Sequence, residues 1–179
     1  LSTVYADSPE RFPNTARPAG CLTADLDGDG EQEIPVQTAF YGYANAADGS
    51  PLNMTNWYVC RGGLLMREYA SYYAVQDGYV FIMPTRWERQ VTAVQEDNEI
   101  VFYEYDTEAQ TEDGEPVLLA PLLRLTAVTD ADEAEALQEE GYLLMQSRNG
   151  SYYLAMTESG GRAALSLTQS ELLFAMKYL

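Results

Sequence analysis

The chain has 179 residues, with 28 acidic and 10 basic side chains and no histidine, so its net charge is −18. This charge argues against nucleic-acid binding, because proteins that neutralise phosphates need clustered Lys and Arg. Without histidine, Ser-His-Asp and Cys-His nucleophile systems and histidine-containing zinc sites are excluded within this chain.

Residues 1–20 are predicted to be an irregular lead-in that contains three prolines. The chain begins at Leu1 without a methionine. We interpret it as a mature or truncated protein, with any signal sequence and any missing part of its first unit lying upstream. No apolar run reaches the roughly 18 residues of a membrane-spanning helix, so no transmembrane segment is expected.

An Asp- and Gly-rich segment follows, with the sequence Asp25-Leu26-Asp27-Gly28-Asp29-Gly30-Glu31-Gln32-Glu33. Its carboxylates stand at alternating positions and at its end, and a hard cation such as Ca²⁺ takes about six to eight oxygen ligands. Carboxylates packed this closely repel one another unless a cation lies between them, which is the reason to expect one. The alternative is a loop that keeps Asp and Gly for turn geometry alone.

The segment is not an EF-hand, because Pro35 and Val36 stand where that loop ends in a bidentate Glu. It resembles the nine-residue calcium loop of FG-GAP/VCBS-type repeats, in which a strand–loop–strand hairpin binds Ca²⁺. The loop occurs once in a short chain, so the resemblance implies a structural metal site and not a propeller. The implied ligands are the side chains of Asp25, Asp27, Asp29 and Glu33 and the carbonyl of Glu31.

Residues 56–61 and 64–74 are predicted to form a strand pair that turns at Gly62-Gly63. Cys21 and Cys60 both fall on predicted strands. They can form a disulfide, which would fit an extracytoplasmic protein, or remain two buried free thiols. The sequence does not decide between the two, because it does not give the distance between their Cα atoms.

Further strands are predicted at residues 79–83, 91–95 and 100–105, and residues 106–116 are predicted to form a loop. All charged side chains of residues 96–115 are acidic. Such a run usually forms a solvated surface, and a docking surface for a basic partner is the alternative. Residues 117–128 are apolar but interrupted by Pro121, which predicts a loop or bulge that leads into a strand.

Two helices and a hairpin complete the chain. Asp130 is a suitable N-cap and Gly141 a suitable stop for the first helix. Residues 142–148 and 151–157 form a predicted hairpin around Asn149-Gly150. A second helix is expected from a capping box of Thr168 and Glu171 up to Leu179, with an apolar stripe along it.

Residues 78–87, Gly-Tyr-Val-Phe-Ile-Met-Pro-Thr-Arg-Trp, resemble the opening G-x-x-F-x-x-P-x-x-W motif of PsbP-like domains. These are small α/β sandwiches of secreted and envelope proteins. The resemblance implies that Phe81 and Trp87 fill the interior, and it transfers a fold but no activity. The calcium-type loop together with such a domain resembles uncharacterised lipoproteins of Gram-positive bacteria.

The sequence therefore predicts an α+β protein, mainly antiparallel β-sheet with two helices, in two units: a β-rich unit at 1–71 and a PsbP-like α/β sandwich at 72–179. We expect an acidic, extracytoplasmic module, secreted or lipid-anchored, with no catalytic residues. It would bind or scaffold an unknown cell-envelope glycan or protein and hold a structural Ca²⁺. The alternatives are a carbohydrate-active or cell-wall hydrolase with paired carboxylates, and a structural spacer.

Overall fold

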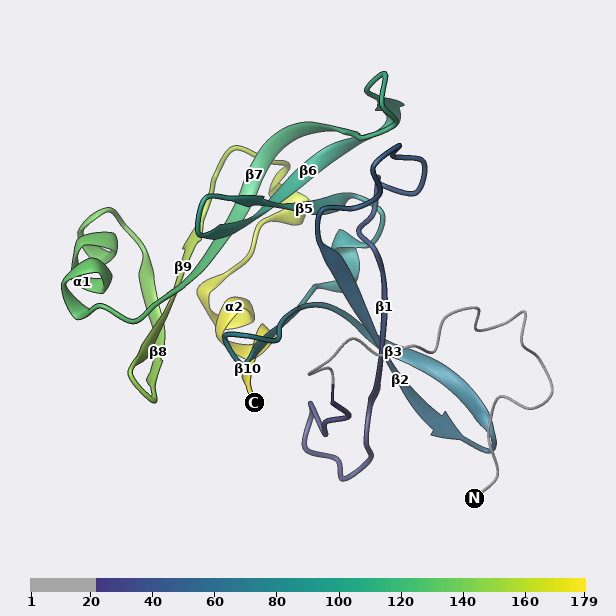
Figure 1. Cartoon of the computed structure of the whole chain (residues 1–179), viewed down its shortest axis with the longest axis horizontal. Coiled ribbons are helices and arrows are strands. Elements are labelled where there is room, and N and C mark those ends of the chain that lie inside the picture. The colour runs from purple at the N-terminus through teal and green to yellow at the C-terminus, as the bar shows by residue number, and fades with distance from the viewer. Residues whose placement is uncertain (1–21) are drawn as a thin grey trace. The chain divides into compact units, whose positions relative to one another are not determined.

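The computed structural model describes residues 22–179, which form two five-stranded sheets, two α-helices and two short 3-10 turns (Figure 1). Beyond the first strand, neighbouring strands in both sheets pair antiparallel. The predicted α+β class, mainly antiparallel with two helices, is thereby confirmed. The resemblance to PsbP-like domains stays a prediction.

The chain divides into two compact units that are both discontinuous in sequence. Within the described residues, unit 1 consists of 22–38, 53–83 and 175–179, and unit 2 of 39–52 and 84–174. The boundary predicted between residues 71 and 72 instead falls inside one strand, where both residues pair with a neighbouring strand on each side.

The sheet of unit 1 is built around a long hairpin of two strands that turns at Gly62 and Gly63. Both glycines have positive φ, +61° and +80°, as the predicted turn requires. Trp57 is completely buried, packs with Leu26 and Val80, and donates from Nε1 to Ser71 Oγ at 2.8 Å. In sheet order the strands are β1 (Ile34–Ala39), β2 (Asn53–Arg61), β3 (Leu64–Ala74), β4 (Tyr79–Ile82) and β10 (Met176–Tyr178).

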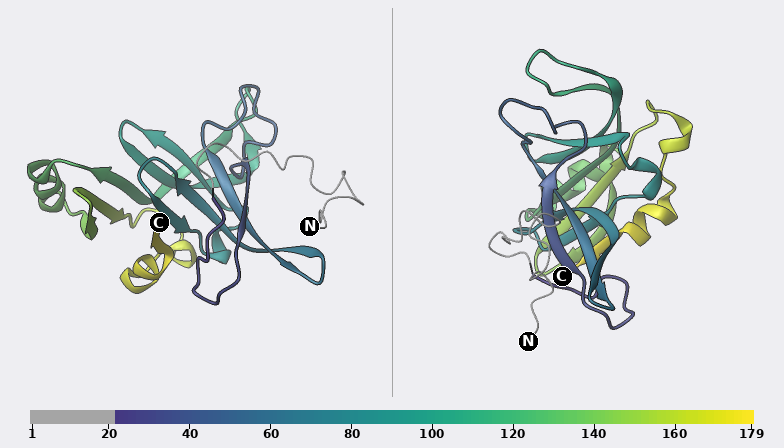
Figure 2. Two further views of the ribbon diagram at one scale, coloured as in Figure 1. Left: turned by 60° about the horizontal axis from the view of Figure 1, so that its bottom comes forward. Right: turned by 90° about the vertical axis from the view of Figure 1, so that its right-hand side faces the viewer.

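Unit 2 contains the second sheet. In sheet order its strands are β5 (Val91–Glu96), β6 (Glu99–Gln110), β7 (Pro116–Val128), β9 (Ser151–Thr157) and β8 (Leu143–Arg148). The helix α1 (Ala131–Glu139) packs beside the β8–β9 hairpin, as Figures 1 and 2 both show, and its Ala134 forms a buried cluster with Val128, Tyr142 and Leu154. Trp87 of the 3-10 turn η1 (Thr85–Trp87) is completely buried and donates to the Leu165 carbonyl of η2 (Ala163–Leu165) at 2.7 Å.

Three sequence predictions about elements need correction. The acidic loop predicted over residues 106–116 is shorter, because β6 continues to Gln110. The strand β7 runs unbroken through Pro121, and the expected irregularity is a set of register shifts in its pairing with β6. The last helix, α2 (Gln169–Ala175), does not reach Leu179, because the chain changes to β10 and pairs Met176 with Phe81 of β4.

Candidate metal centre

The Asp-rich segment forms a closed loop in unit 1. Ala24 and Glu33 pair as an antiparallel bridge, with N–O distances of 3.3 and 2.9 Å, and so bring the two ends of the loop together. Leu26, the one apolar residue of the loop, is buried against Trp57 and Val80. Its burial anchors an otherwise polar loop to the core of unit 1.

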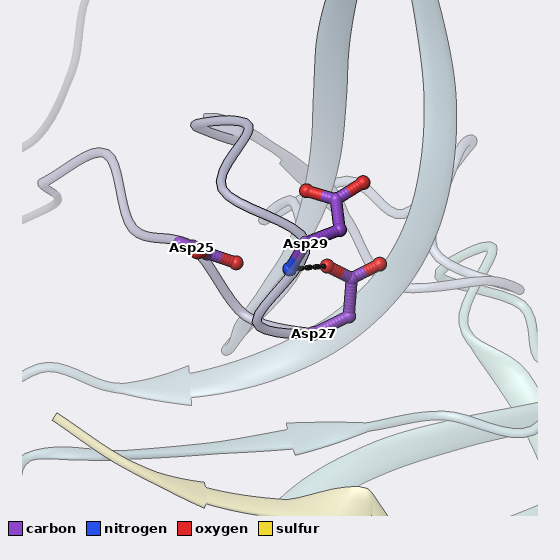
Figure 3. Close-up of side chains that lie close together, drawn as sticks. All are labelled: Asp25, Asp27 and Asp29. Carbon is purple, nitrogen blue, oxygen red and sulfur yellow. Dashed lines mark hydrogen bonds between the residues drawn. The ribbon is translucent and has the colours of Figure 1, made fainter.

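The aspartates of the loop accept hydrogen bonds from backbone N–H groups of the loop itself. Asp25 accepts from the backbone N–H of Gly28 at 2.7 Å and of Gly30 at 3.0 Å. Asp27 accepts from the N–H of Asp29 at 3.1 Å, as Figure 3 shows. Gly28 and Gly30 have φ of +81° and +87°, so the curl of the loop depends on two residues that adopt this conformation without strain.

The curled loop gathers three of the predicted ligands. Asp25, Asp27 and Asp29 each offer one carboxylate oxygen, and these oxygens all lie within 4.8 Å of one another. All three side chains are exposed, so an ion from solvent has access to them. This group can hold a metal ion, and three carboxylates alone do not select Ca²⁺ over other hard cations.

The fourth predicted side-chain ligand, Glu33, lies outside that group but against the loop. Its side chain is completely buried, and Oε2 accepts from the N–H of Leu26 at 2.7 Å. Within the described part of the chain, Oε1 has no hydrogen-bond partner. Burial raises the pKa of Glu33, and the charges of Asp27, Asp25 and Asp29 raise this pKa further.

Glu31, predicted to contribute its carbonyl, directs its side chain to an arginine. Its Oε2 lies 2.6 Å from Nη2 of Arg61, the last residue of β2. The same Nη2 lies 3.8 Å from Oδ2 of Asp29, and Nη1 lies 2.9 Å from Oε1 of Glu68 on β3. Arg61 thus supplies positive charge to one side of the loop.

Tyr69 of β3 is a second neighbour that the loop sequence does not indicate. Its hydroxyl donates to Oδ2 of Asp27 at 2.7 Å. This hydrogen bond lowers the pKa of Asp27 and raises that of Tyr69, because it favours the carboxylate and the protonated phenol together. The predicted β2–β3 hairpin was the available signal for Arg61 and Tyr69, but it does not reveal that this hairpin lies beside the loop.

The other residues that the sequence singled out are Asp130 and the two cysteines. Asp130 caps α1 by accepting from the N–H groups of Asp132 and Glu133, as expected for a helix start. Cys60 is exposed, which corrects the expectation that it is buried as a free thiol, and it forms no disulfide among the described residues, which do not include Cys21. Their pairing therefore stays a prediction.

In unit 2, three carboxylates surround Arg124 of β7. The guanidinium pairs with Glu99 at 3.0 Å, Glu158 at 3.0 Å and Glu96 at 3.3 Å. The hydroxyls of Tyr103 and Tyr142 donate to Glu96 and Glu99, respectively. These three carboxylates therefore form ion pairs with one arginine. The alternative of a hydrolase with paired carboxylates stays a prediction.

Comparisons with protein families, curated proteins and solved structures find no match for this chain. Over residues 22–179, no helix combines the length and the apolar character needed to cross a bilayer. Function is therefore inferred from the geometry of the loop itself.

Proposed function

We propose that the loop of residues 25–33 binds Ca²⁺ and that the ion stabilises the fold of unit 1. The side chains of Asp25, Asp27, Asp29 and Glu33 and the carbonyl of Glu31 would coordinate it, and water would complete the shell. The likeness to FG-GAP/VCBS-type loops fits this assignment.

The observation that carries the proposal is the environment of Glu33. A completely buried carboxylate with one unpartnered oxygen among the described residues is costly beside three more carboxylates. A divalent cation in the loop would offset both the desolvation of Glu33 and its repulsion by the aspartates. A loop that kept its aspartates for turn geometry alone would not need a buried fourth carboxylate.

Calcium suits this donor set better than magnesium does. Ca²⁺ accepts six to eight oxygens in irregular geometry at about 2.3–2.6 Å, whereas Mg²⁺ requires a nearly regular octahedron at about 2.0–2.1 Å and retains its waters. The loop offers carboxylates on an exposed curl, with one deeper ligand. Extracellular modules fill such sites at Kd values of about 10⁻⁴ to 10⁻³ M.

We further propose that the chain works outside the cytoplasm, where calcium reaches these concentrations. We propose that it serves as a non-catalytic binding or scaffolding module of a secreted or lipid-anchored envelope protein. Calcium would then keep unit 1 folded, so that the protein can bind its partner without catalysing a reaction. Its ligand would be a glycan or a protein of the envelope.

Thermal unfolding in EDTA, in Mg²⁺ and in Ca²⁺ tests the calcium assignment. At a hundredfold excess over Kd, a ligand that binds only the folded state stabilises it by about 2.7 kcal/mol. For a chain of this size that corresponds to a rise in Tm of about 5–10 °C. We expect this rise with Ca²⁺ and a much smaller one with Mg²⁺.

The matched variants are Asp27→Asn in the loop and Asp48→Asn in an exposed turn of unit 2. Both remove one negative charge, but only Asp27→Asn should abolish the response to Ca²⁺. No rise in wild-type Tm at about 10 mM Ca²⁺, where even weak extracellular sites fill, would overturn the calcium assignment. An equal rise in both variants would show that calcium acts on net charge and not at the loop.

A further inference from the structure

We propose that Arg61 is an internal competitor of the cation, which lowers the affinity of the loop and so sets the calcium concentration at which it fills. This inference rests on the proposed calcium site. It concerns a residue at the end of β2, which is not one of the proposed ligands.

The position of Arg61 is fixed from two sides. On the loop side, its Nε and Nη2 lie 2.8 and 2.6 Å from Oε2 of Glu31. On the hairpin side, its Nη1 lies 2.9 Å from Oε1 of Glu68, a residue of the adjacent strand. A guanidinium held by both carboxylates stays beside the loop, although the Arg61 side chain as a whole is 46% exposed.

Arg61 also reaches one of the clustered carboxylates. Its Nη2 lies 3.8 Å from Oδ2 of Asp29, while Oδ1 of the same residue accepts from the Glu31 N–H at 2.7 Å. Asp29 is one of the three aspartates whose oxygens lie within 4.8 Å of one another. A divalent ion bound by Asp29 would therefore lie close to a fixed positive charge.

The buried Glu33 shows why this arginine does not replace the ion. The ion pairs of Arg61 described above reach Asp29, Glu31 and Glu68, whereas Glu33 Oε1 has no partner among the described residues. Arg61 therefore neutralises the outer side of the loop, and the deeper carboxylate still calls for a cation. Arg61 would therefore weaken cation binding at the outer side of the loop, while Oε1 of Glu33 would still lack a partner among the described residues.

The alternative role for Arg61 predicts the opposite effect. If its bonds to Glu31 served mainly to position that residue's carbonyl as a ligand, removing the arginine would weaken cation binding. If Arg61 acts as a competitor, removing it strengthens binding. The sign of the change in Kd therefore decides between the two roles.

The experiment is a titration with Tb³⁺, whose luminescence Tyr69 can sensitise, followed by displacement with Ca²⁺. Wild type is compared with Arg61→Gln, Arg61→Lys and Arg67→Gln. Arg67→Gln is the matched control, since it removes one positive charge from β3 at a residue that contacts Asn56. Circular dichroism confirms that each variant is folded.

In low salt, we expect Arg61→Gln to lower the Kd for Ca²⁺ about threefold to tenfold. This is the size of the repulsion between a unit charge and a divalent ion about 6–12 Å apart in water. The difference should shrink in about 0.5 M NaCl, where the Debye length falls to a few ångströms. Arg61→Lys and Arg67→Gln should bind about as wild type does.

The outcomes separate this inference from the calcium site itself. If wild type binds and Arg61→Gln binds equally well or more weakly, the competitor role is overturned and the calcium site stands. The competitor role is likewise overturned if Arg67→Gln tightens binding as much as Arg61→Gln does. If neither wild type nor Arg61→Gln binds at about 10 mM Ca²⁺, the calcium site is overturned, and the competitor role with it.

Discussion

Glu33 and Asp27 show how neighbouring carboxyl groups in one loop acquire opposite properties. Glu33 is completely buried, and its pKa is raised by desolvation and by the adjacent aspartates. Asp27 is exposed, and its pKa is lowered mainly by the hydrogen bond from Tyr69. The loop therefore combines an outer carboxyl group whose pKa lies below its usual range with an inner one whose pKa lies above it, and a bound cation would favour the ionised form of both.

This contrast predicts that Glu33→Gln stabilises the calcium-free protein. The amide oxygen can still accept from the Leu26 N–H, and the buried charge is gone, so we expect the free energy of unfolding in EDTA at neutral pH to rise by about 1 kcal/mol. Because the pKa of folded Glu33 exceeds its unfolded value, folding takes up protons near that pKa. Wild type therefore loses stability relative to the variant as pH rises through the raised pKa.

Urea unfolding of both proteins, in EDTA and in Ca²⁺, measures this effect. In Ca²⁺ we expect wild type to have the larger free energy of unfolding, because the Glu33 carboxylate binds the ion more strongly than the amide of the variant does. A variant that is less stable by the same amount in both solutions would show that Glu33 is a structural residue only.

The elements that the sequence predicted well are those with local determinants. Asp130 caps α1, Thr168 and Glu171 exchange the hydrogen bonds of a capping box, and Asn149-Gly150 forms a turn with φ of +53° and +82°. The end of α2 was not predictable in this way. An apolar spacing over so few residues fits a helix or a strand, and pairing with β4, a distant segment, decides for the strand.

The same contrast between local and long-range determinants holds for the residues of the loop and their neighbours. Its aspartates and glycines predicted the curl that gathers three carboxylates, since those contacts lie within nine residues. Arg61 and Tyr69 were missed, because their contacts with the loop span 30 and 42 residues. Only the pairing of strands brings such residues to the site.

The local character of the β8–β9 turn gives a prediction for that element. Gly150→Ala places a Cβ in open space at a residue with φ of +82°, so only backbone strain opposes it. We expect a loss of about 1 kcal/mol in the free energy of unfolding by urea. Gly160→Ala is the control, since its Cβ would lie an ordinary 3.7 Å from Ala120 Cβ and no positive φ is involved. Equal losses in the two variants would contradict the strain argument.

At the scale of the whole chain, two compact units with interleaved sequences share a net charge of −18. Self-repulsion of this size opposes the compact state, so any salt stabilises the protein to some degree. A global measurement of stability cannot by itself separate that effect from cation binding in the loop. A residue-resolved measurement can, because the contacts of the loop described above, through Leu26, Arg61 and Tyr69, all lie within unit 1.

Hydrogen exchange followed by mass spectrometry should therefore locate the calcium response. A bound ion would tie residues 25–33 together, and the loop contacts β2 and β3 through Arg61 and Tyr69. We expect slower exchange in Ca²⁺ than in EDTA over the loop and the β2–β3 hairpin, because local opening there becomes costlier. The β8–β9 hairpin of unit 2 should exchange equally in both solutions. Asp27→Asn should lose the difference in the loop, and slowing spread evenly over both units would instead indicate that calcium acts only by screening the net charge.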